Sequence, residues 1–283
     1  MGKGRPCPQN EFLYPISEKI ATFLPMADPA NHIVAIACEQ PGLVSRARQL
    51  AEVFRLPLAE GAGEEFRHLL TVTEQRLELR QTGKGAPGPI FTDFLVGAAQ
   101  YRRKHGGGRD QAVAKAVGLR GKNLPTIFDA TAGLGGDSFV LACLGCQVQM
   151  MERSPVIFAL LEDGIKRAMA DKEIGPLIRR RLTLTLGDSQ KFLEGLTRNK
   201  PEVIYLDPMY PHREKNALAK KEMRTLRAIV GDDQDAHLLF RTALACGAKR
   251  VVVKRPRLAP PLDDREPDLV LPGKSSRFDV YFP

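Results

Sequence analysis

A carboxylate, a proline and an aromatic ring directly follow a short apolar run at residues 203–206. The order is Asp207, Pro208, Met209, Tyr210, Pro211. An exocyclic amine of a nucleobase is a poor nucleophile, because its lone pair is delocalised, so an enzyme that alkylates it must orient it. Asp207 and the Pro208 carbonyl can accept its two N–H bonds, and Tyr210 can stack on the base. The alternative is an ordinary tight turn after a buried strand.

Length and composition predict a soluble protein with a substantial core. The chain has 283 residues, 43% of them hydrophobic, which allows a main domain with a smaller companion. No apolar run approaches the ~18 residues of a membrane span, and residues 1–8 lack the apolar segment of a signal peptide. We therefore expect a cytoplasmic protein without membrane association.

The five cysteines and five histidines are scattered along the chain. Cys143 and Cys146 have zinc-like spacing, but no second pair follows them, and Gly145 between them is typical of a helix end. We expect reduced thiols and no metal site.

Basic residues are concentrated in a few segments. The formal charge is +9, and between residues 100 and 125 a single acid, Asp110, accompanies seven basic residues. These are Arg102, Arg103, Lys104, Arg109, Lys115, Arg120 and Lys122. Further clusters lie at 179–181, 213–227 and 249–257. This distribution suits a phosphate backbone, although a solvated basic surface is the alternative.

The chain divides into two predicted domains, 1–88 and 89–283. The first is expected to be a small α/β unit with a strand at 33–38, a helix at 42–54 and a hairpin of 69–72 with 77–79. The Gly- and Pro-rich run 83–89 predicts a linker.

Strand and helix patterns alternate from residue 126 onward. Strands are expected at 127–130, 148–151, 182–186, 203–206 and 250–254, and helices at 137–144, 154–171, 189–196, 215–229 and 235–245. Two further helices are expected before them, at 91–104 and 109–117, separated by three glycines. The alternation predicts a parallel, doubly wound sheet, and 269–271 with 278–282 predict an antiparallel C-terminal pair.

Four successive strand ends carry residues suited to an adenosine cofactor. Ligands of open α/β sheets bind at the carboxyl ends of the strands. Those ends supply the glycine loop 129–137 with Gly133, Gly135 and Gly136, then Glu152 for ribose hydroxyls, Asp188 with Ser189 for an adenine, and Asp207. Each acid has an alternative as a helix cap or surface residue, and Asp188 with Ser189 can simply open the next helix.

The charge of the glycine loop favours one cofactor over another. Asp129 and Asp137 flank the loop, which disfavours a pyrophosphate and favours the cationic amino and sulfonium groups of S-adenosylmethionine (SAM). We therefore expect an α/β, Rossmann-like SAM-dependent methyltransferase fold. It would have a seven-stranded, mostly parallel sheet with an antiparallel C-terminal strand, plus the small N-terminal α/β unit.

Several long motifs resemble one family, the RsmJ-type small-subunit (16S) ribosomal RNA guanine 2-amino methyltransferases. They are 91–118, 129–141 (DATAGLGGDSFVL), 151–155 (MERSP), 205–224 (YLDPMYPHREKNALAKKEMR), 251–261 (VVVKRPRLAPP) and 273–281. The resemblance implies SAM as cofactor, S-adenosylhomocysteine as product, and 16S rRNA or the small ribosomal subunit as partner. By motif match it implies cofactor contacts at Gly136, Asp137, Glu152, Arg153, Asp188, Ser189 and Asp207. Two departures from the pattern are Gly136, where family members have a basic residue, and Met209 in place of a second proline.

The resulting hypothesis is methyl transfer to an unpaired or flipped-out guanine, with Asp207, Pro208 and Tyr210 as catalytic residues. Predicted RNA contacts are Arg102, Arg103, Lys104 and Arg109, with Lys254 and Arg255 beside the pocket. The alternatives are an amino-methyltransferase acting on DNA adenine or protein glutamine, a non-catalytic RNA-binding protein, and a nicotinamide oxidoreductase.

Overall fold

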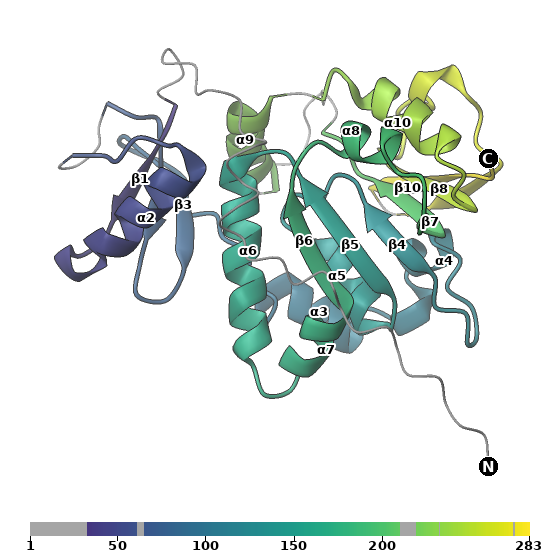
Figure 1. Ribbon diagram of the computed structural model, residues 1–283, viewed down its shortest axis with the longest axis horizontal. Helices are drawn as coiled ribbons and strands as arrows, with labels where there is room; N and C mark the ends of the chain where they lie inside the picture. Colours follow the sequence, from purple (N-terminus) through teal and green to yellow (C-terminus); the bar gives the residue numbers. More distant parts are fainter. Residues whose placement is uncertain (1–32, 61–64, 210–218, 232, 274) are drawn as a thin grey trace.

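The computed structural model describes residues 33–60, 65–209, 219–231, 233–273 and 275–283 (Figure 1). Within them the chain forms a three-stranded sheet and a seven-stranded sheet. Of the described helices, none combines the length and the apolar character needed to cross a membrane.

The seven-stranded sheet has the strand order β6-β5-β4-β7-β8-β10-β9. Its strands are β4 (Thr126–Asp129), β5 (Gln147–Glu152), β6 (Leu182–Leu186), β7 (Val203–Leu206), β8 (Arg250–Pro256), β9 (Leu269–Pro272) and β10 (Ser276–Tyr281). The strands from β6 to β8 pair in parallel, whereas β10 pairs antiparallel with both β8 and β9. The predicted mostly parallel sheet with an antiparallel C-terminal strand is confirmed.

Helices cover both faces of this sheet. They are α3 (Gly97–His105), α4 (Ala112–Ala116), α5 (Gly136–Cys143), α6 (Pro155–Ala170), α7 (Gly175–Arg181), α8 (Ser189–Glu194), α9 (Ala219–Val230) and α10 (Ala236–Ala245), with short 3₁₀ turns η2 (Gly108–Asp110) and η3 (Leu262–Asp264). Alternate residues of β7 enter opposite cores: Tyr205 packs with α4, α5 and α7, and Ile204 packs with α8 and α10. All four residues of β7 are buried, as expected of a central strand covered on both faces.

Two helix predictions need correction. The helix expected from residue 91 begins at Gly97, because Asp93 accepts hydrogen bonds from the backbone N–H groups of Leu95 and Val96 and holds a turn there. Helix α7 was not predicted from the sequence; it follows a similar turn, in which Asp171 accepts from the backbone N–H groups of Glu173 and Ile174. The predicted start of a helix at 215 lies outside the described residues.

The N-terminal unit contains β1 (Val34–Cys38), η1 (Pro41–Leu43), α2 (Val44–Phe54), β2 (His68–Val72) and β3 (Leu77–Gln81). β1 pairs parallel with β2, and β2 pairs antiparallel with β3, which confirms the predicted strand, helix and hairpin. Beyond the predicted linker, Ile90 returns to this sheet and pairs with Leu79.

Helix α6 joins the two sheets through a shared apolar cluster. Val34, Leu70 and Leu79 of the small sheet pack in one cluster with Phe158 and Leu160 of α6. Figure 1 accordingly places α6 between the small sheet and the large one. The division at residue 88 therefore stays a prediction, and the two parts share a core.

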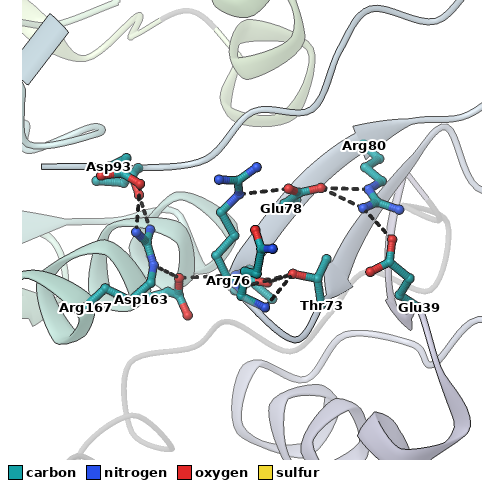
Figure 2. Close-up of polar contacts among 11 residues, drawn as sticks. Glu39, Thr73, Arg76, Glu78, Arg80, Asp93, Asp163 and Arg167 are labelled. Atoms are coloured by element: carbon teal, nitrogen blue, oxygen red, sulfur yellow. Dashed lines mark hydrogen bonds and ion pairs between the residues drawn. The ribbon is translucent and has the colours of Figure 1, made fainter. Parts of the chain in front are cut away.

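A buried carboxylate adds polar contacts to this junction (Figure 2). Asp163 of α6 accepts a hydrogen bond from the Leu77 backbone N–H at 3.1 Å, and its side chain pairs with Arg46 and Arg167, each at 3.0 Å. Arg167 also pairs with Asp93 at 3.0 Å. Asp163 thus links α6 directly to α2 and β3, and through Arg167 to the segment leading into α3.

Candidate active site

A cleft of about 750 Å³, including its solvent-open part, lies at the carboxyl ends of the parallel strands. The proposed site residues that line it are Gly133, Glu152, Arg153, Asp188, Ser189, Asp207 and Pro208. The other lining residues are Ala130, Thr131, Met151, Ile157, Gln190, Met209, Leu226, Val230, Asp233, Asp235, Ala236 and Leu239.

The glycine loop between β4 and α5 requires glycine at two positions. Gly133 has φ 53° and Gly135 has φ 72°, in the left-handed region that favours glycine. A Cβ on Gly135 would also lie 2.6 Å from Leu161 Cδ1. Gly136 is exposed and has open space around it, so a side chain could stand there. Three of the proposed cofactor contacts do not line the cleft: Gly135, Gly136 and Asp137.

Glu152, at the end of β5, is fixed by two backbone donors. Its Oε2 accepts from the Gly133 N–H at 2.9 Å and its Oε1 accepts from the Ser154 N–H at 2.8 Å. The residue is 7% exposed, and burial raises its pKa. Each oxygen keeps a second acceptor position, which suits a pair of ribose hydroxyls.

Asp188 and Ser189 lie at the start of α8. Asp188 Oδ1 accepts from the Gln190 and Lys191 N–H groups, at 2.9 and 3.2 Å, so the helix-cap alternative is confirmed for this residue. Ser189 is buried, and its Oγ donates to the Ala130 carbonyl at 2.7 Å. The Ser189 bond joins the ends of β4 and β6 on the cleft wall.

Asp207 follows β7 and is held from two sides. Its backbone N–H donates to Thr131 Oγ1 at 2.6 Å, and its Oδ2 pairs with Lys254 Nζ at 2.8 Å. Burial raises the pKa of this carboxyl group, which Lys254 opposes. Tyr210, the third proposed catalytic residue, lies outside the described residues.

Asp137 lies behind Asp207 in a network of charges. Its Oδ2 accepts from Lys254 Nζ at 2.9 Å and from the Tyr205 hydroxyl at 2.7 Å, and its Oδ1 pairs with Arg102 at 2.8 Å. Burial alone would raise its pKa, but Lys254 and Arg102 outweigh burial and lower it to about 2. Asp137 is therefore ionised, and Lys254 bridges two carboxylates.

The remaining proposed RNA contacts are spread over several environments. Lys104 and Arg109 are exposed, although Arg109 also donates to the Gly121 carbonyl. Arg103 pairs with Glu173 at 2.8 Å. Arg255 is only 5% exposed and donates to the Pro260 carbonyl, so it lies within the protein rather than on the surface.

Asp233 and Asp235 also line the cleft, although the sequence did not predict them as site residues. Arg153 pairs with both: its Nη1 lies 2.9 Å from Asp235 Oδ2, and its Nη2 pairs with Asp233 Oδ1. In the sequence these aspartates resemble an ordinary polar loop before a helix. Only the fold brings them to the cleft, so no local signal could have identified them.

Among the described residues, no group of three or more His, Cys, Asp or Glu side chains is placed to hold a metal ion. Burial raises the pKa of Cys143 and of Cys146 to about 11, which disfavours the thiolate that a metal would need.

The chain matches a family model described as "Putative SAM-dependent methyltransferase" over residues 49–283. A curated relative named ribosomal RNA small subunit methyltransferase J, from Pseudomonas aeruginosa (strain LESB58), is 49% identical over 90% of this chain and 95% of its own length. The protein of that name from Pseudomonas fluorescens (strain Pf0-1) is also 49% identical, over 89% and 96%. The crystal structure of a SAM-dependent methyltransferase from Neisseria gonorrhoeae is 38% identical, with a TM-score of 0.67, covering 88% of this chain and 96% of that one.

Proposed function

Because this chain belongs to the family of SAM-dependent methyltransferases that includes ribosomal RNA small subunit methyltransferase J, we propose that it methylates the 2-amino group of a guanosine. SAM is its cofactor, and small-subunit (16S) ribosomal RNA is the substrate class of the family. The guanine amine as the acceptor and the roles of individual residues are part of the proposal.

The walls of the cleft fit SAM. Glu152 offers acceptors for ribose hydroxyls, Ser189 and Asp188 line the part proposed for the adenine, and Ile157 and Leu239 add apolar surface. The backbone at Gly133 can be approached closely. When bound, SAM supplies a methyl group on a cationic sulfur, and its transfer leaves S-adenosylhomocysteine.

The observation that carries the proposal is the position of Asp207 and Pro208 on the wall of this cleft. Lys254 engages Asp207 Oδ2, and the described contacts leave Oδ1 for an N–H of the amine. The Pro208 carbonyl supplies a second acceptor. Two acceptors together favour a tetrahedral nitrogen with its lone pair directed away from them. Partial burial in the cleft raises the pKa of Asp207, whose side chain is 38% exposed, and this makes it a better acceptor for the proton released.

Helix α3 offers a surface for RNA. Tyr101 is 64% exposed, and its ring centroid lies 5.2 Å from that of His105. Exposed Lys104 and Arg109 lie beside them in the sequence. Aromatic rings stack on unpaired bases, and basic side chains contact phosphates. Such contacts would offset the few kcal/mol that extruding a base costs.

The proposal is tested by incubating the protein with labelled SAM and small subunits from a strain that lacks the corresponding methylation. Nucleoside analysis should yield N2-methylguanosine, and mapping should place it at one nucleotide. Asp207→Ala should abolish transfer while RNA affinity stays within about twofold, with Asp268→Ala as a matched removal of an exposed carboxylate. Label in adenosine, DNA or glutamine instead of guanosine would refute the acceptor.

A further inference from the structure

The peptide between Pro208 and Met209 is held on one side by Asp233. The Met209 N–H donates to Asp233 Oδ2 at 2.5 Å, and the Asp233 N–H donates back to the Met209 carbonyl at 3.2 Å. Asp233 lies in the segment between α9 and α10, 24 residues beyond Met209. These paired bonds attach the turn after β7 to a distant segment of the chain.

A bond to the Met209 N–H also determines the direction of the Pro208 carbonyl. Both groups belong to one planar peptide unit, and no peptide bond among the described residues is cis. In a trans unit the N–H and the C=O point in opposite directions. Asp233 therefore fixes the Pro208 oxygen on the far side of the peptide plane. A negatively charged acceptor on the N–H also polarises the unit and strengthens its carbonyl as an acceptor.

Arg153 in turn orients Asp233. The Asp233 side chain is 14% exposed, with Oδ1 paired to Arg153 and Oδ2 used for Met209, so both oxygens have defined partners. Arg153 directly follows Glu152, whose carboxylate faces the proposed ribose position. Arg153 and Asp233 thus connect the end of β5 with the turn after β7.

We propose that Asp233, held by Arg153, is a positioning residue that aims the Pro208 carbonyl at the acceptor amine. This inference rests on the proposed function, because it assigns Pro208 to the amine. It gives Arg153 a structural partner on the protein, whereas the family resemblance implies a cofactor contact for the same residue.

The test compares Asp233→Ala with Asp235→Ala. Both changes remove a carboxylate that pairs with Arg153 at the rim of the cleft, but only Asp233 bonds to the turn. Misplacing a reacting group by about 1 Å can cost on the order of 100-fold in rate. We expect kcat to fall about 100-fold for Asp233→Ala and only a few fold for Asp235→Ala. The KM for small subunits and the calorimetric Kd for SAM should stay within about threefold in both variants. Asp233→Asn, whose amide oxygen can still accept from Met209 although its amide nitrogen cannot accept from Arg153, should recover part of the loss.

Equal losses of kcat in the two alanine variants would overturn the inference, as would a loss that appears in the Kd for SAM instead of kcat. Hydrogen exchange of the Met209 amide gives a measurement that needs no activity. It should be slow in the wild-type protein, much faster in Asp233→Ala and intermediate in Asp233→Asn; equal exchange in all three would refute the role.

These outcomes are separate from those of the proposed function. If the wild-type protein transfers the label to an amine other than guanosine, the acceptor is wrong, yet the kcat comparison and the Met209 exchange still decide the role of Asp233. Circular dichroism shows whether Asp233→Ala is folded. If it is not, Asp233→Asn and the exchange of its Met209 amide decide the question.

Discussion

Replacing Lys254 by methionine tests the electrostatics of the site most directly. Lys254 Nζ lies 2.8 Å from Asp207 Oδ2 and 2.9 Å from Asp137 Oδ2, and its side chain is 28% exposed. Methionine keeps much of the length and removes the charge. Two neighbouring carboxylates then lose their shared cation, which disfavours ionised Asp207.

The magnitude follows from the distance and the exposure. At 2.8 Å the attraction of two unit charges is about 6 kcal/mol at an effective dielectric constant of ~20 and about 1.5 kcal/mol in bulk water. The Asp207 side chain is 38% exposed, so solvent screening moves the value toward the lower figure, and we take about 2 kcal/mol. If the whole amount is expressed in the transition state, kcat falls about 30-fold at neutral pH.

The direction of the pH effect follows from the sign of the charge. Lys254 lowers the pKa of Asp207, whereas burial, Asp137 and Asp233 raise it. Without Lys254 the carboxylate is protonated at higher pH, so the acid limb of the kcat profile should move to higher pH. The profile is measured between pH 5.5 and 9.5 with labelled SAM and unmethylated small subunits.

Lys249→Met is the matched control, because Lys249 makes one exposed ion pair with Glu202 at 2.8 Å. Filter binding at several salt concentrations separates positioning from RNA contact. A phosphate contact by Lys254 would weaken RNA binding and reduce the salt slope by about one, with kcat retained. That result, or a kcat profile identical to that of the wild-type protein, would refute the assignment of Lys254 to Asp207.

Three further predictions concern stability. Burial raises the pKa of Asp129 from 3.8 to about 7, so the folded state binds the carboxyl proton more tightly than the unfolded state does. The free energy of unfolding therefore falls as the pH rises from 3.8 to about 7. Asp129→Asn should abolish this pH dependence and increase the free energy of unfolding at pH 8 by up to roughly 4 kcal/mol, measured by urea unfolding. Gly135→Ala should lower the free energy of unfolding by about 1–3 kcal/mol, because Gly135 has a positive φ. Gly136→Ala in the same loop should be neutral or slightly stabilising in thermal unfolding, and equal losses of stability in the two variants would contradict this account. Asp163→Ala should cost about 1–3 kcal/mol, because it leaves the buried Leu77 N–H without its acceptor, while Arg167 keeps Asp93 and Arg46 is half-exposed. Glu39→Ala, which removes an exposed pair, should cost at most about 1 kcal/mol, and comparable urea midpoints for the two variants would argue against this account.

The order of elements and the edge of the sheet that carries the site were predictable from sequence. Runs such as residues 203–206 are apolar throughout because the strand is buried on both faces, so the pattern is unambiguous. The rule for parallel sheets then places Glu152 and Asp207 at one edge, where the structure has them.

Contacts between distant segments were not predictable in the same way. Lys254 belongs to a basic cluster in the sequence, which predicted RNA binding. In the structure Leu206, the last residue of β7, pairs with Val253 of β8. Asp207 and Lys254, which follow these two residues, therefore lie side by side. Strand register depends on packing of the whole sheet, and the sequence pattern does not determine it.

The contacts of Asp233, which lies in a loop, were also not predictable from the sequence. Its polar neighbours resemble a solvent-exposed connection, and its bonds to Met209 and Arg153 arise only once α9 and α10 are placed. The start of α3 at Gly97 depended on a more local feature, the turn held by Asp93, which competes with helix formation.

Helix α6 has a consequence for how this protein can be shortened. Ile157 forms part of the cleft wall, while its neighbours Val156 and Phe158 pack in the cluster shared with β1 to β3. A fragment starting after residue 88 would expose the apolar face of α6 to water and would remove the residues that pack behind Ile157. The small sheet therefore supports the wall of the cofactor pocket. A methyltransferase fragment that lacks this sheet should be poorly soluble and should bind SAM more weakly.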